Sequence, residues 1–134
     1  MKIIDGKETI LGRLASYAAK EALKGEEIVI INSEKIIITG RKENIQKEFS
    51  EKKGRIGSAQ KGPKYSTPNE KIVKRTIRGM LPNYREGRGR EAYKRIKCYV
   101  GIPKEFEKVD KISLTKDKKL KFLELSKIFK KWIK

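Results

Sequence analysis

The residues best suited to chemistry lie in one basic stretch, residues 77–103, where arginines, glycines and tyrosines are gathered around two prolines. Arginine presents a planar fork that pairs with a phosphate at two points and also stacks on a base. Glycine lets the backbone approach a ligand closely. Arg85, Arg88 and Arg90, which are interspersed with glycines, therefore favour an RNA-binding surface over a generic charged one.

The net charge supports a polyanionic partner. The 134 residues include 35 Lys plus Arg against 17 Asp plus Glu, a formal charge of +18. Residues 1–48 are nearly neutral at +1, residues 49–100 carry +11, and residues 101–134 carry +6. This excess is larger than solubility requires, and its concentration in the middle of the chain indicates where the partner binds.

Four of the five tyrosines lie inside the basic zone, namely Tyr65, Tyr84, Tyr93 and Tyr99. Aromatic rings among cations can stack on unpaired bases. We expect Tyr93 and Tyr99 to belong partly to the core. Tyr65 and Tyr84, in polar loops, are predicted RNA contacts.

Catalytic and metal-binding patterns are missing from the sequence. Without histidine there is no Ser-His-Asp or Cys-His pair and no zinc site of the usual Cys/His type. Cys98, the single cysteine, excludes an internal disulfide, fits a reducing setting, and is predicted to be a small core residue rather than a nucleophile. Residues 57–64 have the glycine spacing of a phosphate-binding loop but lack its lysine and its Ser/Thr. We expect no catalytic residue, cofactor or metal ligand.

A helix over residues 67–81 is predicted to hold a row of cations. Thr67 can cap it, Pro68 suits its first position, and Glu70 completes a capping box. Its apolar stripe is Ile72, Val73, Ile77, Met80 and Leu81. Another face carries cations at i, i+3, i+4 and i+7, namely Lys71, Lys74, Arg75 and Arg78. A solvated face is the alternative, but Glu70 is the single acidic partner nearby, so we favour a phosphate backbone.

The chain then turns and returns to the core. Pro82 ends the helix, and residues 83–90 are predicted to form a glycine-punctuated turn. A short helix over residues 91–96 and a strand over residues 97–100 follow. Cys98 and Val100 alternate with polar or aromatic neighbours in that strand and are predicted to return the chain to the core.

The N-terminal part of the chain reads as an α/β scaffold. Residues 1–5 and 27–31 predict strands, the second apolar enough to be buried on both faces of a parallel sheet. Between them, a helix capped by Thr9 is predicted to end at Gly25. A third apolar run, residues 35–39, precedes a helix over residues 41–50. This alternation predicts an α/β domain with a largely parallel sheet.

Two segments lie outside that pattern. Residues 52–66 contain five cations and no acid, so we predict a basic arm that orders on RNA, with a disordered surface loop as the alternative. Residues 104–134 form a C-terminal extension, weakly structured to residue 119. A terminal helix from Ser126 is predicted to dock Leu125, Ile128 or Phe129, and Trp132 on the scaffold, with Lys127, Lys130, Lys131 and Lys134 outward; a membrane-surface helix is the alternative.

Length and hydropathy limit the class of protein. A chain of 134 residues fits a single domain, residues 1–134, with a modest core. Its longest apolar runs are too short to span a bilayer, and its N-terminus has no apolar segment of signal-peptide length. We expect a soluble, cytosolic protein.

Several blocks of this sequence resemble one known family. Residues 78–82 (RGMLP), Gly87, Gly89 and residues 99–103 (YVGIP) are similar to the signature of the large-subunit ribosomal protein L13 family. Residues 11–15 (LGRLA) and 37–40 (IITG) resemble its other recurrent blocks, so the resemblance runs over about residues 1–106. Residues 87–103 and the missing histidines look like the archaeal and eukaryotic branch.

The resemblance implies a three-layer α/β/α fold with a parallel four-stranded sheet, plus a basic loop and a C-terminal extension. It also implies a structural role in the large subunit of the cytoplasmic ribosome, without enzymatic activity. The implied partners are large-subunit rRNA and neighbouring ribosomal proteins, with no membrane and no small-molecule substrate. In the family, the RGMLP helix and the loop after it lie against rRNA.

Charge, spacing and resemblance together define the predicted RNA-binding residues. Arg75, Arg78, Arg85, Arg88 and Arg90 carry over from the family pattern. The full set is Lys52, Lys53, Arg55, Lys61, Lys64, Tyr65, Lys71, Lys74, Arg75, Arg78, Tyr84, Arg85, Arg88, Arg90, Lys94 and Arg95.

Two other functions fit parts of the sequence. A parallel α/β sheet can host a nucleotide cofactor at its strand ends, where Asp5, Asn32 and Gly40 are predicted to lie, so an RNA-modifying enzyme is one alternative. A protein that coats DNA without regard to sequence is the other. Equal affinity for duplex DNA and for rRNA fragments would indicate the latter.

Overall fold

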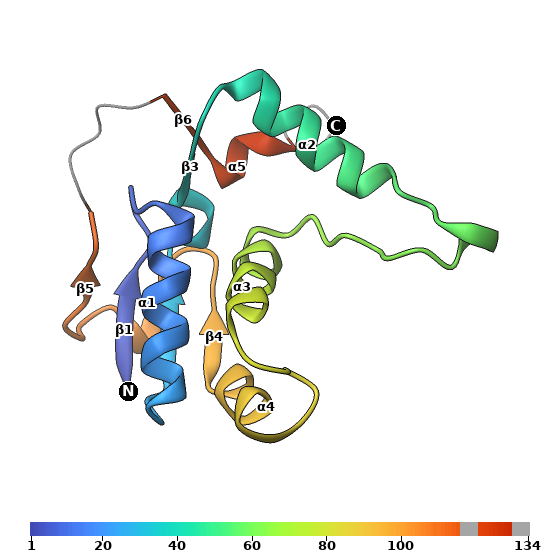
Figure 1. Cartoon of the computed structure of the whole chain (residues 1–134). Coiled ribbons are helices and arrows are strands. Elements are labelled where there is room, and N and C mark those ends of the chain that lie inside the picture. The colour runs from blue at the N-terminus through green and yellow to red at the C-terminus, as the bar shows by residue number, and fades with distance from the viewer. Residues whose placement is uncertain (116–120, 130–134) are drawn as a thin grey trace.

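A four-stranded parallel sheet forms the centre of the protein (Figure 1). The structure is a computed structural model that describes residues 1–115 and 121–129. Across these two ranges, no helix is both long and apolar enough to cross a membrane. The elements, in chain order, are β1 (Lys2–Asp5), α1 (Leu11–Leu23), β2 (Ile28–Ile31), η1 (Ser33–Lys35), β3 (Ile37–Thr39), α2 (Lys42–Gly54), η2 (Ser58–Gln60), α3 (Asn69–Met80), α4 (Gly87–Lys94), β4 (Ile96–Cys98), η3 (Lys104–Phe106), β5 (Ile112–Ser113), β6 (Phe122–Glu124) and α5 (Leu125–Ile128).

The strand order of the main sheet is β4-β2-β1-β5, and every pairing in it is parallel. Ile30 pairs with Ile4 on one side and with Cys98 on the other. All four residues of β2 are buried, as its continuous apolar run predicts. The predicted parallel four-stranded sheet is confirmed.

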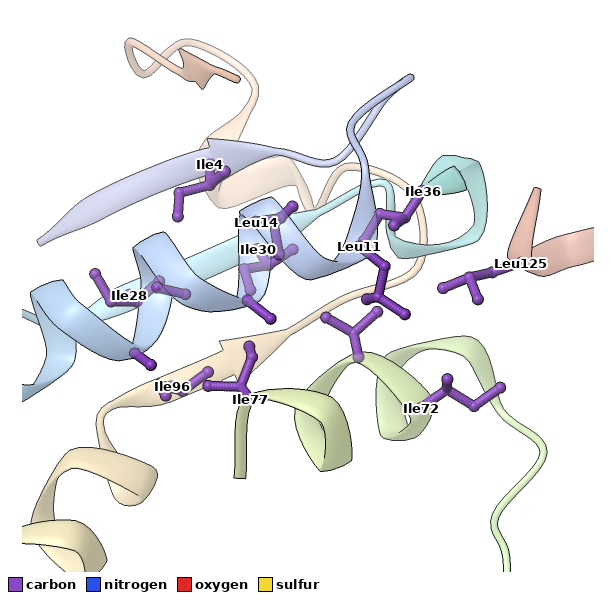
Figure 2. Packing of buried hydrophobic residues seen from close by; sticks show 14 of the residues in the cluster. Ile4, Leu11, Leu14, Ile28, Ile30, Ile36, Ile72, Ile77, Ile96 and Leu125 are labelled. Atoms are coloured by element: carbon purple, nitrogen blue, oxygen red, sulfur yellow. The ribbon is translucent and has the colours of Figure 1, made fainter. Parts of the chain in front are cut away.

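Side chains of β1 and β2 alternate between two apolar layers. Ile4, Ile28 and Ile30 belong to the larger core cluster, which α1, α3 and α4 cover from one side. Figure 2 shows these isoleucines packed with Leu14 of α1 and Ile77 of α3. On the opposite face of the sheet, residues Ile3, Val29 and Ile31 pack with Tyr99 and with Phe106 of η3. The sheet is therefore the middle of the three-layer α/β/α arrangement, whose second outer layer is thin.

An ion-pair cluster joins the start of β1 to the end of α1. The carboxylate of Glu21 is buried and accepts hydrogen bonds from the ammonium groups of Lys2 and Lys24, the latter at 2.9 Å. These hydrogen bonds lower the pKa of Glu21 to about 2. The charged form of Glu21 is thus strongly favoured in the folded protein.

The third apolar run does not join the main sheet. It forms β3, which pairs antiparallel with β6 in a separate two-stranded sheet. Only η1 separates β2 from β3, whereas a parallel crossover needs a dozen or more residues. The fourth strand of the main sheet is β5, which lies in the stretch predicted to be weakly structured.

The C-terminal segment belongs to the core. Leu125, Ile128 and Phe129 are buried, as predicted for a docked helix, and Leu123 of β6 is buried with them. Helix α5 begins one residue before the predicted start. Trp132, and the outward lysines predicted at positions 130, 131 and 134, lie outside the described residues.

Both predicted N-terminal caps are wrong, whereas Gly25 follows the C-cap of α1 with a positive φ, as predicted for the residue that ends this helix. Helix α3 begins at Asn69 with Pro68 as its N-cap, and the Pro68 carbonyl accepts 3.1 Å hydrogen bonds from the backbone N–H groups of Lys71 and Ile72. The helix starts too late for Thr67 to reach it. Thr9 is buried one residue before the N-cap of α1, and its hydroxyl donates to backbone carbonyl groups instead.

Three features of residues 77–103 also differ from the predictions. Helix α4 includes the glycine-rich residues predicted to form a turn, because Gly89 packs closely on the backbone of Pro82. Met80 is 43% exposed rather than part of the apolar stripe, because it lies in the last turn of α3 beyond the sheet. Strand β4 ends at Cys98, so Val100 stays exposed in the loop that follows.

Candidate nucleic-acid interface

Helix α3 is the centre of the candidate interface. Ile72, Val73 and Ile77 are fully or almost fully buried against the core, which fixes how the helix is rotated. The four cations predicted on another face lie at exposed or half-buried positions: Lys71, Lys74, Arg75 and Arg78. The structure therefore places them as one row along the helix surface.

The guanidinium group of Arg75 lies over an aromatic ring at the end of the basic arm. Its Cζ atom is 4.4 Å from the centroid of the Tyr65 ring, within the range of a cation–π interaction. Arg75 also donates a 3.3 Å hydrogen bond to the backbone carbonyl of Lys64. Tyr65 in turn packs edge-on against Phe49 of α2, with centroids 5.9 Å apart. Tyr65 was predicted in a polar loop, but the structure packs it against the core cluster.

A second group of rings lies beside the other cations of α3. Arg78 Cζ is 4.6 Å and Arg85 Cζ is 5.5 Å from the centroid of the Tyr84 ring. Lys74 Nζ is 4.7 Å from the centroid of the Tyr93 ring, and the two tyrosine rings are 6.1 Å apart. Three cations and two rings therefore form one continuous cluster.

The hydroxyl group of Tyr84 is part of the same cluster. It accepts a 3.3 Å hydrogen bond from Nε of Arg85. That hydrogen bond, with the positive charges of Arg85, Arg78 and Arg75, lowers the pKa of Tyr84. The phenolate form of Tyr84 is therefore favoured relative to a free tyrosine, first by the Arg85 hydrogen bond and then by the nearby positive charges.

Helix α4 adds exposed cations next to this cluster. Arg88 and Arg90 lie in its first turn, and Lys94 at its end; all three side chains are exposed. Arg95 differs, because it donates a 3.3 Å hydrogen bond to the carbonyl of Ala22 at the end of α1. Arg95 therefore links two helices in addition to any contact with a ligand.

Residues 55–66 of the basic arm project away from the body of the protein between α2 and α3 (Figure 1), whereas residues 52–54, predicted as the start of the arm, form the end of α2. Arg55, Lys61 and Lys64 are exposed on it. At its tip the backbone N–H of Gly62 donates a 2.9 Å hydrogen bond to the carbonyl of Ile56, which closes a tight loop. A Cβ atom on Gly57 would overlap the backbone of Gly62, so this loop needs glycine there.

A hollow of about 310 Å³ lies where the arm, α2 and α3 meet. It is lined by Lys52, Arg55, Pro63, Tyr65, Arg75 and Thr76. The ammonium group of Lys52 is also engaged within α2, 2.6 Å from the Glu48 carboxylate and 5.3 Å from the Phe49 ring centroid. Lys53 Nζ lies 5.5 Å from the Phe129 ring centroid.

A second basic hollow was not predicted from the sequence. It measures about 520 Å³ and is lined by Gly40, Arg41, Lys42, Glu43, Lys121 and Phe122. The glycine and two cations at the start of α2 were a local signal for it. Lys121 joins them through the pairing of β3 with β6, which the sequence pattern did not reveal.

The structure brings together only two of the three residues predicted at the strand ends for the enzyme alternative, Asp5 and Asn32. Asp5 uses its carboxylate to accept 2.9 Å hydrogen bonds from the Asn32 side chain and the Lys7 backbone. Gly40 follows β3, which lies outside the main sheet. Cys98 packs against the core as predicted, and burial raises the pKa of its thiol to about 12, which is unsuited to a nucleophile.

Comparison with known proteins gives a consistent result. Residues 1–105 match the family model of ribosomal protein L13. The chain is 48% identical over 132 residues to the large ribosomal subunit protein uL13 of Methanocaldococcus jannaschii, an alignment that covers 95% of this chain and 96% of the relative. It is 43% identical to uL13 of Archaeoglobus fulgidus, with 94% and 83% covered, and 50% identical to uL13 of Methanosphaera stadtmanae, with 78% and 75% covered. The resemblance inferred from the sequence blocks, including its archaeal character, is confirmed.

Proposed function

Since this chain belongs to the ribosomal protein L13 family, we propose that it is a structural component of the large ribosomal subunit that binds large-subunit rRNA. The surface that we assign to RNA consists of the cationic row of α3, the start of α4 and the basic arm. We expect the protein to act in the cytoplasm, on the ribosome, and to have no catalytic role.

The row of cations on α3 is the observation that carries this proposal. Lys71, Lys74, Arg75 and Arg78 extend along one helix, and Arg88 and Arg90 lie nearby at the start of α4. In residues 1–115 and 121–129, no ion pair to an acidic side chain is present for any of these six cations. Such a surface attracts phosphates, which supply the dominant, salt-dependent part of RNA affinity.

The sixteen predicted contact residues fall into two groups in this proposal. Exposed cations such as Lys71, Arg88 and Arg90 meet phosphates directly. Others have a structural partner as well, as Lys52 has in Glu48 and Arg95 in the Ala22 carbonyl. We expect Lys52 and Arg95 to contribute less to affinity, because an RNA phosphate would compete with the carboxylates of Glu48 and Glu91 for these cations.

Neutralisation of phosphates in this way would stabilise folded rRNA and assist subunit assembly. The net charge of +18 far exceeds what a single row of contacts needs. We therefore propose that rRNA lies against the α3 and α4 surface and also follows the arm, and that other large-subunit proteins adjoin the chain at less basic surfaces.

Binding to large-subunit rRNA fragments, measured across a series of salt concentrations, tests the proposal. The logarithm of the association constant should fall steeply with the logarithm of salt concentration. Arg88→Ala should reduce that slope by about 0.7–0.9, the contribution of one phosphate contact. Lys108→Ala is the matched control, because Lys108 is exposed on the segment that follows η3, away from the assigned surface. An association constant that is flat across salt, or equal affinity for duplex DNA, would contradict the proposal.

A further inference from the structure

We propose that Tyr65, Tyr84 and Tyr93 are positioning residues, which hold the cations of α3 in a fixed array before RNA arrives. This inference rests on the RNA-binding function proposed above and assigns the tyrosines a role different from stacking on bases. The part of RNA that this surface recognises is the phosphodiester backbone. The tyrosines affect its binding indirectly, because they position the cations that contact it.

The first argument is the regularity of the pairing. Three neighbouring cations of α3 each lie over a tyrosine ring, at 4.7, 4.4 and 4.6 Å from the ring centroids. The three tyrosines come from different parts of the chain: the end of the arm, the loop after α3, and α4. Three separate segments thus deliver one ring each to successive positions on the same helix face.

The second argument is that the rings themselves are held in place. Tyr65 packs edge-on against Phe49, whose own ring is 6.0 Å from the Phe129 ring, both of them buried. Tyr84 and Tyr93 lie against one another, 6.1 Å between centroids. Lys74, Arg75 and Arg78 are therefore each supported by a ring with restricted freedom, which is what a positioning element requires.

The third argument concerns which ring faces remain open. A face covered by a guanidinium or ammonium group is closed to a nucleotide base. Tyr84 has two guanidinium groups near its ring, from Arg78 and Arg85, and its hydroxyl accepts the Nε–H of Arg85. A base could stack on the ring face that Arg78 covers only after that contact had been displaced.

The physical benefit is a smaller loss of freedom on binding. A free arginine side chain has many rotamers, and it loses this conformational entropy when it binds a phosphate. A guanidinium group already stacked on a ring has lost part of that freedom in the free protein, while its edge N–H groups still point outward to a phosphate. An exposed cation–π contact corresponds to roughly two- to five-fold in an equilibrium constant, so loss of one ring should weaken binding by about three-fold.

The first test uses the free protein and needs no RNA. Proton signals of the Arg78 side chain should be shifted upfield by the ring current of Tyr84. Tyr84→Leu should return them to the values of an unstructured arginine, whereas Tyr84→Phe should preserve the shift. Unshifted Arg78 signals in the wild-type protein would overturn the inference without touching the proposal that the surface binds RNA.

The second test is a mutant cycle on rRNA affinity at low salt. Tyr84→Leu alone should lower the association constant about three-fold. In a background that lacks both guanidinium groups, Arg78→Ala with Arg85→Ala, the same change should have a much smaller effect, because the Tyr84 ring then supports only the ring of Tyr93.

A matched background distinguishes positioning from base stacking. Arg88 has no ring partner among the contacts of the described residues, so in an Arg88→Ala background Tyr84→Leu should keep its full effect. If the loss in the Arg78→Ala, Arg85→Ala background equals the loss in the wild type, Tyr84 contacts RNA itself and the positioning role is wrong. If wild-type binding is flat across salt, the failure belongs to the proposed function instead.

Discussion

Two helical glycines should respond to alanine in opposite directions. Gly79, in α3, has no atom within 4 Å of the place a Cβ would occupy, whereas a Cβ on Gly89, in α4, would lie closer than 3.0 Å to the backbone oxygens of Pro82 and Asn83. Alanine is favoured over glycine inside a helix by about 0.8–1.0 kcal/mol. Gly79→Ala should therefore raise the free energy of unfolding by up to about 1 kcal/mol.

Gly89→Ala gains the same helix propensity but must move a backbone segment. Overpacking of this kind costs about 1–3 kcal/mol, and here the obstacle is main chain rather than a flexible side-chain end. We expect a net loss of up to about 2 kcal/mol, which corresponds to a melting temperature lower by up to about 8 °C for a chain of this size. The displacement would also shift Arg88 and Arg90, so rRNA affinity should fall.

Urea and thermal denaturation of the two variants beside the wild type would measure this difference. Because both changes add one methyl group to a helical glycine, each is the control for the other. A Gly89→Ala protein as stable as Gly79→Ala would refute the close approach of α4 to the Pro82 turn, and with it the explanation of why this glycine is accommodated in a helix.

Three further predictions concern the core and the titrating groups. Ile77→Ala should cost about 2–5 kcal/mol in unfolding free energy because its side chain is fully buried, while Met80→Ala, three residues on and 43% exposed, should change it far less; urea titration compares them. The pKa of Glu21 is about 2 in the folded protein, against an ordinary value of 4.5. The ionised carboxylate therefore contributes its full stabilisation above pH 4.5, and this contribution is lost as the pH falls towards 2. Glu21→Gln should flatten the dependence of unfolding free energy on pH in that window, as measured by denaturation at each pH. The thiol of Cys98, with a pKa raised to about 12 by burial, should react slowly with a disulfide reagent at pH 8 and quickly in urea; rapid labelling of the folded protein would contradict its core position.

Local patterns predicted the elements of the scaffold well. The apolar runs of β1 and β2, the helical spacing of α1 and the cationic row of α3 each depend on neighbours a few residues apart, and each is present in the structure. These features were readable because periodicity records which face of an element is buried.

The pairing of strands that lie far apart in the chain could not be predicted from local periodicity. The position of β3 depends on β6, more than eighty residues later, and β5 has only two residues and no periodicity to detect. The short η1 connection was nevertheless a usable signal, because it excludes a parallel crossover between β2 and β3.

The candidate interface was predictable in composition but not in arrangement. Charge and glycine content indicated the cations, yet nothing in the sequence revealed that Tyr65, Tyr84 and Tyr93 meet the cations of one helix. Glycine content also predicted a turn where the structure has the start of α4. Gly89 lies in this helix because a side chain there would overlap the backbone of Pro82 and Asn83. Contacts between segments, rather than residue types, decided these outcomes.

The pairing of β6 with β3 has a consequence for biosynthesis. A ribosome releases the chain from its N-terminus, so β3 and the apolar face of α2 emerge well before the residues that cover them. Ile45 and Phe49 of α2 belong to the same core cluster as Leu123, Ile128 and Phe129, which are made more than seventy residues later. Strands β1, β2 and β4 of the main sheet can pair before β6 has been made, whereas the small sheet can close only after residue 124 has been released. Nascent chains stalled before residue 122 should therefore expose an apolar helix face and become clients for chaperones.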